Sequence, residues 1–328
     1  MQAVHPEDNV GTNLADELTP LNYYTILSDE EPASVYTNAN LRSFRITQPL
    51  QINMENDSLH MRFYSPVGIK EVTVMAKSPT MDEYVEFVYI DNIPAFADIK
   101  TSIKVLEKGL YRTESGKVLQ FSAEEMNPAS LSLKIACNDP YWTKISQIKA
   151  KWYIKFVLNG GNPVTGTPNK NWWGIRPVHC REAVALFLNI GYMCTLEKFQ
   201  QRVSTFQGTF LDNNRYPVDT STLISRLENL SGFDIGLIYS GNGVSGLGGG
   251  RTWGVYQKSF LYHYENSGGC CSTIFHELGH CLGYNHNSTM TYGQWASGCA
   301  DVFYKNNIKD FPVNSHTILK SRSNPNIY

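Results

Sequence analysis

The sequence carries three histidines and one glutamate at a spacing that suits a metal ion. His276, Glu277, His280 and His286 fall within eleven consecutive residues of a chain that has eight histidines in all. Residues four apart on a helix are stacked on one face, so the imidazoles of His276 and His280 can bind one ion. Glu277 directly follows the first ligand, which places its carboxylate beside the ion rather than on it.

Gly283 explains how a third ligand can reach the same ion. A glycine lets a helix end in a left-handed turn without the steric cost of a Cβ atom. The chain can then bend back and deliver His286. Three neutral imidazoles leave a fourth tetrahedral position open to water, which is typical of a catalytic zinc site rather than a structural one. We therefore expect Zn²⁺ bound by His276, His280 and His286.

These groups predict a hydrolytic reaction. Zinc lowers the pKa of its bound water toward about 7 and polarises a carbonyl oxygen. Glu277 would take a proton from that water as it attacks a peptide carbonyl, and would then pass the proton to the departing amine. The expected protein is a zinc metalloendopeptidase with Glu277 as general base and acid, acting on a protein or peptide substrate.

The run His276-Glu-Leu-Gly-His280-Cys-Leu-Gly283-Tyr-Asn-His286 resembles the signature of the metzincin zinc endopeptidases, which is followed by a methionine turn. Ser288-Thr-Met290-Thr-Tyr292 is similar to that turn. The resemblance covers residues 272–292. It implies that Met290 lies beneath the metal as a hydrophobic floor. It also implies that Tyr292 reaches the zinc and steadies the oxyanion, as a tyrosine does in the astacin and serralysin branches. A plain core methionine and an ordinary tyrosine are the alternatives.

A helix over the motif and a strand before it would position these groups. Ile274, Leu278, Cys281 and Leu282 form an apolar stripe at helical spacing, after the N-cap candidates Ser272 and Thr273. Residues 233–240 form a short apolar run bounded by glycines, which predicts a buried strand.

The glycine-rich segment between this strand and the motif contains G-x-G-x-x-G at Gly241, Gly243 and Gly246. A dinucleotide site needs a helix at the third glycine, and no helical periodicity follows here. The metzincin resemblance instead implies a glycine-containing loop before an edge strand that pairs with the substrate. Residues 250–256 are the candidate for that strand, with a flexible surface loop as the alternative.

The predicted fold class is α+β. Residues 1–39 are polar and proline-spaced, which predicts an extended tail. Short alternating or β-branched runs, separated by turns, predict an antiparallel β-sandwich accessory domain over residues 40–158. These runs are residues 59–64, 71–76, 84–90, 130–136 and 145–157. A glycine-, proline- and asparagine-rich linker spans residues 159–177. A metzincin-like catalytic domain occupies residues 178–328, with further helices at 181–199, 220–230 and 300–309.

Composition limits the partners. Lys plus Arg is 28 against 30 for Asp plus Glu, a net charge of -2, which argues against nucleic acid and anionic membranes. No run of eighteen apolar residues is present, so no transmembrane segment is expected. The β-sandwich would bind a glycan, a cell-surface ligand or the protein substrate. The pair Trp172-Trp173 at the junction suits packing, or else ligand binding.

The start of the chain lacks the basic and apolar stretches of a signal peptide. We expect a secreted or cell-surface anchored protein whose export signal has been removed. Six of the seven cysteines follow residue 179, which would allow one or two disulfides. Two other functions stay open: a non-catalytic adhesin with a structural zinc site, and a zinc hydrolase with a non-peptide substrate.

Overall fold

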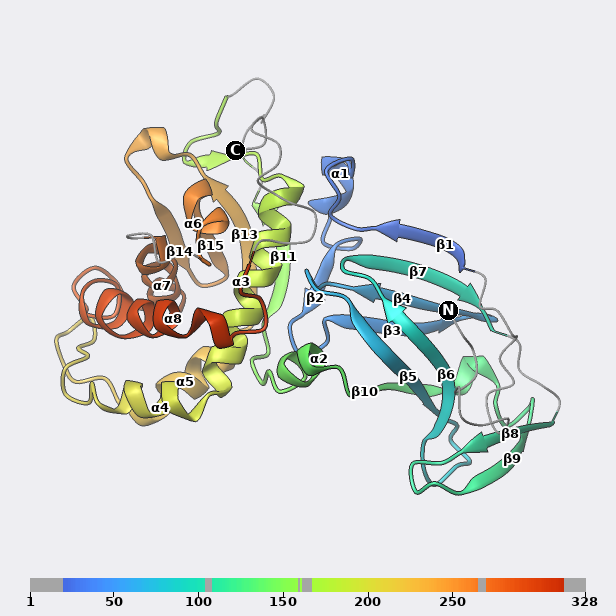
Figure 1. Ribbon diagram of the computed structural model, residues 1–328. Helices are drawn as coiled ribbons and strands as arrows, with labels where there is room; N and C mark the ends of the chain where they lie inside the picture. Colours follow the sequence, from blue (N-terminus) through green and yellow to red (C-terminus); the bar gives the residue numbers. More distant parts are fainter. Residues whose placement is uncertain (1–19, 104–107, 159, 161–166, 265–269, 316–328) are drawn as a thin grey trace. The chain divides into compact units, whose positions relative to one another are not determined.

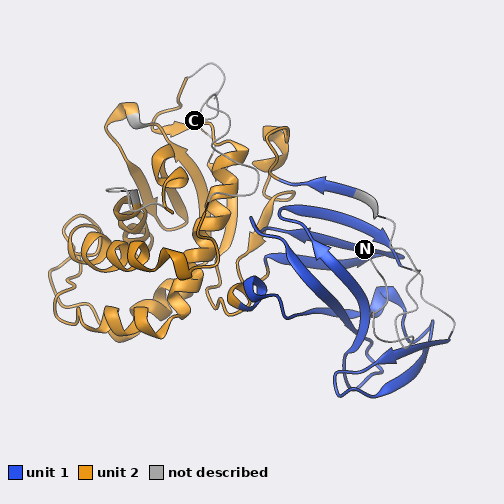
Figure 2. Cartoon of the chain, in the orientation of Figure 1, with its two compact units in different colours: residues 1–26, 49–143 blue, residues 27–48, 144–328 orange. Residues whose placement is uncertain are grey.

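The computed structural model describes residues 20–103, 108–158, 160, 167–264 and 270–315. The chain divides into two compact units (Figure 2). Unit 1 comprises Met1–Ile26 and Pro49–Thr143, and unit 2 comprises Leu27–Gln48 and Lys144–Tyr328. Together they have a mixed α+β structure with several antiparallel sheets, which confirms the predicted class. No helix of the described ranges is both long and apolar enough to span a membrane.

Unit 1 consists mainly of antiparallel β-structure. One sheet has the strand order β1-β7-β4-β3, a second has the order β10-β5-β6, and β8 pairs with β9. The strands are β1 (Pro20–Thr25), β3 (Leu50–Glu55), β4 (Ser58–Phe63), β5 (Ile69–Lys77), β6 (Val85–Ile93), β7 (Ala97–Ser102), β8 (Lys108–Arg112), β9 (Val118–Ser122) and β10 (Ser132–Cys137). A 3₁₀ turn (Pro128–Ser130) precedes β10, and α2 (Pro140–Ile145) contains the unit boundary.

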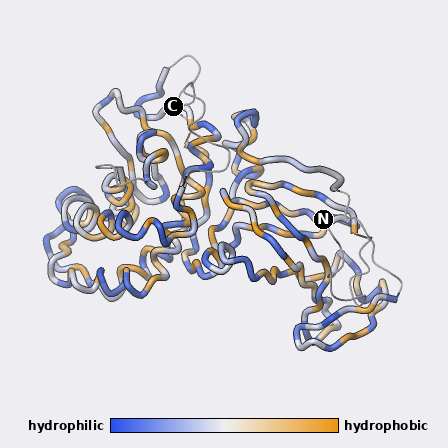
Figure 3. The backbone as a smooth tube through the Cα atoms, in the orientation of Figure 1, coloured by the Kyte–Doolittle hydropathy of each residue, from blue (hydrophilic) through white to orange (hydrophobic). Residues whose placement is uncertain are grey.

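Alternating hydropathy gives unit 1 its core. Successive side chains of a strand point to opposite faces of the sheet. In β4, half-buried Ser58, His60 and Arg62 alternate with buried Leu59, Met61 and Phe63. Figure 3 shows hydrophobic and hydrophilic residues interleaved along these strands. The strands predicted at residues 59–64, 71–76, 84–90 and 130–136 are confirmed as β4, β5, β6 and β10.

Unit 2 is built on one mixed sheet of six strands (Figure 1). Its order is β14-β15-β13-β11-β2, and β12 pairs with β13 beyond the end of β11. The strands β11, β13 and β15 are mutually parallel, and the other three are antiparallel to their neighbours. The strands are β2 (Ser43–Arg45), β11 (Tyr153–Leu158), β12 (Trp172–Trp173), β13 (Gly232–Ile238), β14 (Gly246–Gly249) and β15 (Thr252–Tyr256).

Helices surround this sheet. They are α1 (Ala33–Tyr36), α3 (Pro177–Thr195), α4 (Glu197–Ser204), α5 (Thr220–Glu228), α6 (Gln257–Leu261), α7 (Cys270–Cys281) and α8 (Val302–Asn307). Short 3₁₀ turns occur at Ser240–Asn242 and Ile308–Asp310, and a π-helix at Gln294–Asp301 precedes α8.

The core of unit 2 lies between α3 and the sheet. The ring of Phe187, near the middle of α3, contacts three aromatic residues. Its centroid lies 4.8 Å from that of Phe233 in β13, 4.9 Å from Trp253 in β15 and 6.0 Å from Trp152. Almost every side chain of α3 is buried, including Arg181 and Glu182. Aromatic pairs in such geometry add packing energy to the hydrophobic burial.

Several predicted boundaries differ from the structure. The helix expected at 181–199 is two helices, because Leu196 adopts an extended conformation with ψ 121°. The run 145–157 begins at the end of α2, and only its last residues form β11. The helix expected at 300–309 begins earlier, as the π-helix. The strand at 233–240 and the helix at 220–230 are confirmed as β13 and α5.

The N-terminal segments also differ from the expected tail and from the expected domain limits. Residues 1–19 lie outside the described residues, but β1 pairs with β7 in unit 1. Residues 27–48 belong to unit 2, because β2 pairs with β11 in its sheet. Part of the expected linker at 159–177 also lies outside the described residues, and its described part contains β12.

Candidate metal centre

The three histidines of the motif converge on one point. His276 and His280 lie one turn apart on α7, and His286 follows on the chain after the helix ends. Gly283 has a φ of +91°, so the predicted left-handed turn is confirmed. The pairwise distances between Nε2 atoms are 3.1 Å for His276 and His280, 3.0 Å for His280 and His286, and 3.3 Å for His276 and His286.

Backbone carbonyls fix two of the rings. Nδ1 of His276 donates to the carbonyl of Thr291 at 2.5 Å, and Nδ1 of His280 donates to the carbonyl of Tyr284 at 2.7 Å. A carbonyl oxygen only accepts hydrogen bonds, so the ring hydrogen must sit on Nδ1. Nε2 of each ring then presents a lone pair. Such outer bonds orient histidine ligands in metal sites and raise their basicity.

This geometry fits a metal ion. Lone pairs about 3 Å apart repel one another unless a cation lies between them. A tetrahedral zinc site with Zn–N distances of about 2.0–2.1 Å places its nitrogens about 3.3 Å apart. The observed separations of 3.0–3.3 Å are close to that value. Among the histidine, cysteine, aspartate and glutamate side chains of the described residues, these three histidines are the single group with metal-ligand spacing.

The local environment keeps the rings of His276 and His280 neutral. Burial, with smaller contributions from the neighbouring His280 and His286, lowers the pKa of His276 to about 4. Burial also lowers the pKa of His280, against the effect of its bond to Tyr284. Neutral imidazole is the form that binds metals. His276 and His280 are therefore in the ligating state at neutral pH.

Glu277 is a buried acid at the edge of this cluster. Its side chain is 4% exposed, and Oε1 lies 3.9 Å from Nε2 of His276. Burial raises the pKa of the carboxyl group to about 8. A carboxyl with a pKa near neutrality exchanges protons readily at physiological pH, as a general base and acid must.

Strand β14 lies against Glu277. A Cβ atom added at Gly246 would lie 2.2 Å from Oε1 of Glu277, and one added at Gly248 would lie 2.3 Å from its carbonyl oxygen. Real Cβ atoms do not approach other atoms so closely. The two glycines stand two apart on the strand, so one face of β14 is bare where the carboxylate lies. The contact of these two glycines with Glu277 was not predicted from the sequence, although glycines two apart indicate one bare face of a strand.

The edge of the sheet is also β14. It pairs with β15 alone in the described structure, whereas β15 has β13 on its other side. The prediction that residues 250–256 form the edge strand is therefore wrong, because that segment becomes the interior strand β15. The glycine-rich segment supplies the edge itself rather than the loop before it. α7 packs beside β14 and β15 (Figure 1).

A pocket of about 530 Å³ opens over the histidines. Residues 243–248 form one of its walls, and Tyr292, Ala296 and Ser297 line it from the segment after the motif. His286 is exposed, and Glu277 lines the pocket from α7. Ser272 and Thr273 line it as well. They lie inside α7, which begins at Cys270, so they are not the N-caps that the sequence predicted. Solvent can therefore reach the point where the three Nε2 atoms meet.

The segment 288–292 supports the centre. Met290 is fully buried, and its carbonyl oxygen lies 2.4 Å from where a Cβ atom would stand on Gly279 of α7. The ring of Tyr292 lies 4.4 Å from that of His276 and 5.1 Å from that of His286, measured between centroids. Tyr292 is 57% exposed, so its side chain has room to move.

Six cysteines have side chains that the structure describes, and none of them belongs to the histidine cluster. They are Cys137, Cys180, Cys194, Cys271, Cys281 and Cys299, and no disulfide joins any two of them, contrary to the expectation of one or two bridges. The side chain of Cys270 lies outside the described residues. Burial raises the pKa of Cys281 to about 12, which keeps this thiol of α7 protonated.

Comparisons with protein-family models, with curated proteins and with solved structures find no match to this chain. The resemblance to metzincins therefore stays a prediction that rests on the motif.

Proposed function

We propose that the protein is a zinc-dependent endopeptidase of metzincin type. The observation that carries the proposal is the convergence of three histidine Nε2 atoms, 3.0–3.3 Å apart, in an open pocket beside a buried glutamate. His276, His280 and His286 would hold the ion. Three imidazoles suit zinc, and a bound zinc ion would supply Lewis-acid polarisation of a carbonyl and of a water molecule.

Glu277 moves the proton in this proposal. Its carboxylate takes a proton from the attacking water and returns it to the nitrogen of the departing amine. The close fit of Gly246 and Gly248 around Glu277 restricts the carboxylate to one position, which lowers the cost of orienting it.

In this proposal Tyr292 stabilises the developing oxyanion, and Met290 packs beneath the metal site. The phenol hydroxyl of Tyr292 would donate a hydrogen bond to the carbonyl oxygen as negative charge develops on it. Its exposure and its position beside two of the histidine rings support this role. Met290, buried under the segment that bonds His276, would be the hydrophobic floor.

A peptide is the proposed substrate because a sheet edge borders the pocket. An extended peptide can add to such an edge through main-chain hydrogen bonds, and β14, which pairs on one side only among the described strands, lies beside Glu277. We assign unit 1 the role of a β-sandwich accessory module that binds a glycan, a cell-surface ligand or the substrate. Secretion or surface anchoring belongs to the same proposal.

The test is Glu277→Gln, assayed by digestion of a peptide library. We expect this variant to keep one zinc per chain and to lose about 10²- to 10⁴-fold in kcat, because the amide can neither accept nor return the proton. Wild-type cleavage should stop when a chelator is added and resume with Zn²⁺. Zinc content is measured by elemental analysis.

The outcomes separate the alternatives. Full activity in Glu277→Gln would remove Glu277 from the mechanism. One zinc per chain without chelator-sensitive cleavage of any peptide would favour the adhesin with a structural zinc site. Chelator-sensitive hydrolysis of esters or amides, but of no peptide, would favour a different zinc hydrolase.

A further inference from the structure

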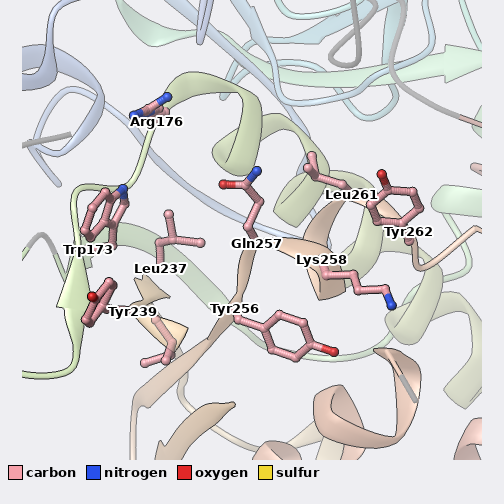
Figure 4. Close-up of a pocket in the computed structure, with 10 residues that line it drawn as sticks. Trp173, Arg176, Leu237, Tyr239, Tyr256, Gln257, Lys258, Leu261 and Tyr262 are labelled. Atoms are coloured by element: carbon pink, nitrogen blue, oxygen red, sulfur yellow. The ribbon is translucent and has the colours of Figure 1, made fainter. Parts of the chain in front are cut away.

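Unit 2 has a second pocket that the metal centre does not use (Figure 4). Its volume is about 710 Å³. It lies at the carboxyl ends of the parallel strands β13 and β15, where Tyr239 and Tyr256 line it. Ligands of open sheets with helices bind at the carboxyl ends of parallel strands, and ligand sites typically measure about 300–1,000 Å³.

One wall of this pocket is aromatic. Strand β12 replaces β11 as the neighbour of β13 and places Trp173 opposite Leu237. The rings of Trp173 and Tyr239 are stacked, with centroids 5.2 Å apart and planes 10° apart. Both side chains are half-buried. Flat, stacked rings at a pocket wall are rigid surfaces against which another planar group can pack.

The pocket also carries positive charge. Arg176 lines it at the residue that precedes α3, and Lys258 lines it from α6. The N-terminus of the nineteen-residue α3 adds the positive end of its helix dipole. None of the ten described residues that line the pocket is aspartate or glutamate. In Figure 4, Trp173 and Tyr239 lie at one side of the pocket and Lys258 at the other.

We propose that this pocket binds a small organic anion built on a flat ring, an aromatic carboxylate or aromatic phosphate. The ring packs against the Trp173–Tyr239 wall, and the anionic group is held by Lys258 on the other side of the pocket, while Arg176 adds positive charge to the lining. Rings alone would suit a neutral ligand or a sugar, but two cations in a lining without carboxylates favour an anion.

The site is separate from the metal but joined to its pocket. The amide of Tyr256, which lines the aromatic pocket, donates to the carbonyl of Ser245 at 3.0 Å, and Ser245 lines the metal pocket. The two pockets share no lining residue, so binding needs no metal. It stands or falls independently of the proposed peptidase activity.

The experiment is calorimetric titration of the full chain in chelator, so that a carboxylate cannot bind through zinc. The probes are 2-naphthoate, 1-naphthyl phosphate, neutral 2-naphthamide and inorganic phosphate. We expect 2-naphthoate to bind with a Kd on the order of 0.1 mM, and 2-naphthamide at least about tenfold more weakly. The ratio of the Kd values of 2-naphthoate and 1-naphthyl phosphate shows which anion the site prefers. Inorganic phosphate should bind more weakly than either, since it lacks the ring.

Variants locate the binding. Lys258→Gln should weaken naphthoate about fivefold, because an exposed cation beside a ligand contributes about 1 kcal/mol. Trp173→Ala should weaken it about tenfold or more, because the ring wall is lost. Lys149→Gln, at an exposed lysine of unit 2 outside the pocket, should change the Kd less than about twofold. Glu277→Gln should leave it unchanged.

Three results would overturn the proposal. They are an absence of saturable binding, equal affinity for naphthamide and naphthoate, and unchanged affinity in Lys258→Gln. If Trp173→Ala fails to fold, Lys258→Gln still decides, because its side chain is exposed and its removal leaves the core intact.

Discussion

His60 in unit 1 and His276 and His280 in unit 2 all have partners at both ring nitrogens, but the partners differ in chemistry. In unit 1, both ring nitrogens of His60 contact carboxylates, Nδ1 with Glu55 at 2.8 Å and Nε2 with Asp98 at 2.6 Å. In unit 2, His276 and His280 have carbonyls at Nδ1 and other histidines at Nε2. The first arrangement stabilises a cation, and the second leaves unshared lone pairs.

The pKa shifts follow the partners. The hydrogen bond to Asp98 raises the pKa of His60, in spite of burial, and the bond to Glu55 adds to the rise. Burial and neighbouring histidines lower the pKa of His276 to about 4. Carboxylates at both ring nitrogens thus favour the protonated form of His60, whereas burial and the facing imidazole favour the neutral form of His276, which is the form that binds metals. Partner chemistry, rather than the number of contacts, distinguishes the two.

The largest expected effect comes from breaking the triad. His280→Ala removes the ring whose Nε2 lies within 3.1 Å of both others. If the proposed function holds, we expect loss of stoichiometric zinc and a fall in the proposed peptidase activity of about 10³-fold or more, because the Lewis-acid contribution is lost. Elemental analysis and a peptide-cleavage assay measure the two effects.

His60→Ala is the matched control for that variant. It removes a half-buried histidine with two close partners but should leave zinc content and cleavage as in the wild type. Equal zinc loss in both variants would mean that the comparison between the two kinds of histidine fails.

A smaller effect is expected from the strand that borders Glu277. Gly246→Ala places a Cβ atom 2.2 Å from Oε1 of Glu277, so the carboxylate must move. Overpacking of this kind costs about 1–3 kcal/mol, and displacement of a catalytic group by about 1 Å lowers kcat about 10²-fold. Zinc content should stay at one per chain. Steady-state kinetics and denaturant unfolding measure the change.

Gly116→Ala controls for a general effect of replacing glycine. Its φ of +82° makes alanine strained, but a Cβ atom there meets nothing within 4 Å. It should lower stability by about 1 kcal/mol and leave kcat unchanged. Full activity in Gly246→Ala would show that Glu277 does not need its present position.

The smallest effect concerns pH. The raised pKa of His60 contributes stability fully below its ordinary value of 6.5, and this stability is lost as pH rises through the folded value. Burial raises the pKa of Asp98, but bonds from His60 and Arg62 outweigh it and hold the value below 3.8, so its contribution is lost only in stronger acid. The denaturant concentration at which unit 1 is half unfolded should therefore fall as the pH is raised from 5.5 to 8.5. The His60→Gln variant should show a smaller fall, and an equal fall would exclude His60 as its source.

The sequence predicted the local parts of the site well. A spacing of four on a helix and a glycine at its end are local properties, so they indicated the triad and the left-handed turn at Gly283. The alternating strands of unit 1 were readable for the same reason. The position of Leu196 between two helices was not readable, since nothing in its local pattern ends α3 there.

Non-local contacts were beyond the sequence. Pairing of β2 with β11, and of β1 with β7, joins segments over 70 residues apart, so no local pattern placed these strands. The same holds for the aromatic pocket, whose wall combines Trp173 with Tyr239. The edge strand was misplaced by a few residues because glycines predict loops, whereas here they form a strand that must lie close to a carboxylate.

The near-complete burial of α3 has a consequence for local unfolding. A helix whose polar side chains are also enclosed cannot fray independently of the sheet it covers. Its backbone amides should exchange with deuterated solvent only when unit 2 opens as a whole. Slow exchange along α3 then measures the free energy of global opening of unit 2, and a ligand bound in the aromatic pocket would slow that exchange without contacting His276, His280 or His286.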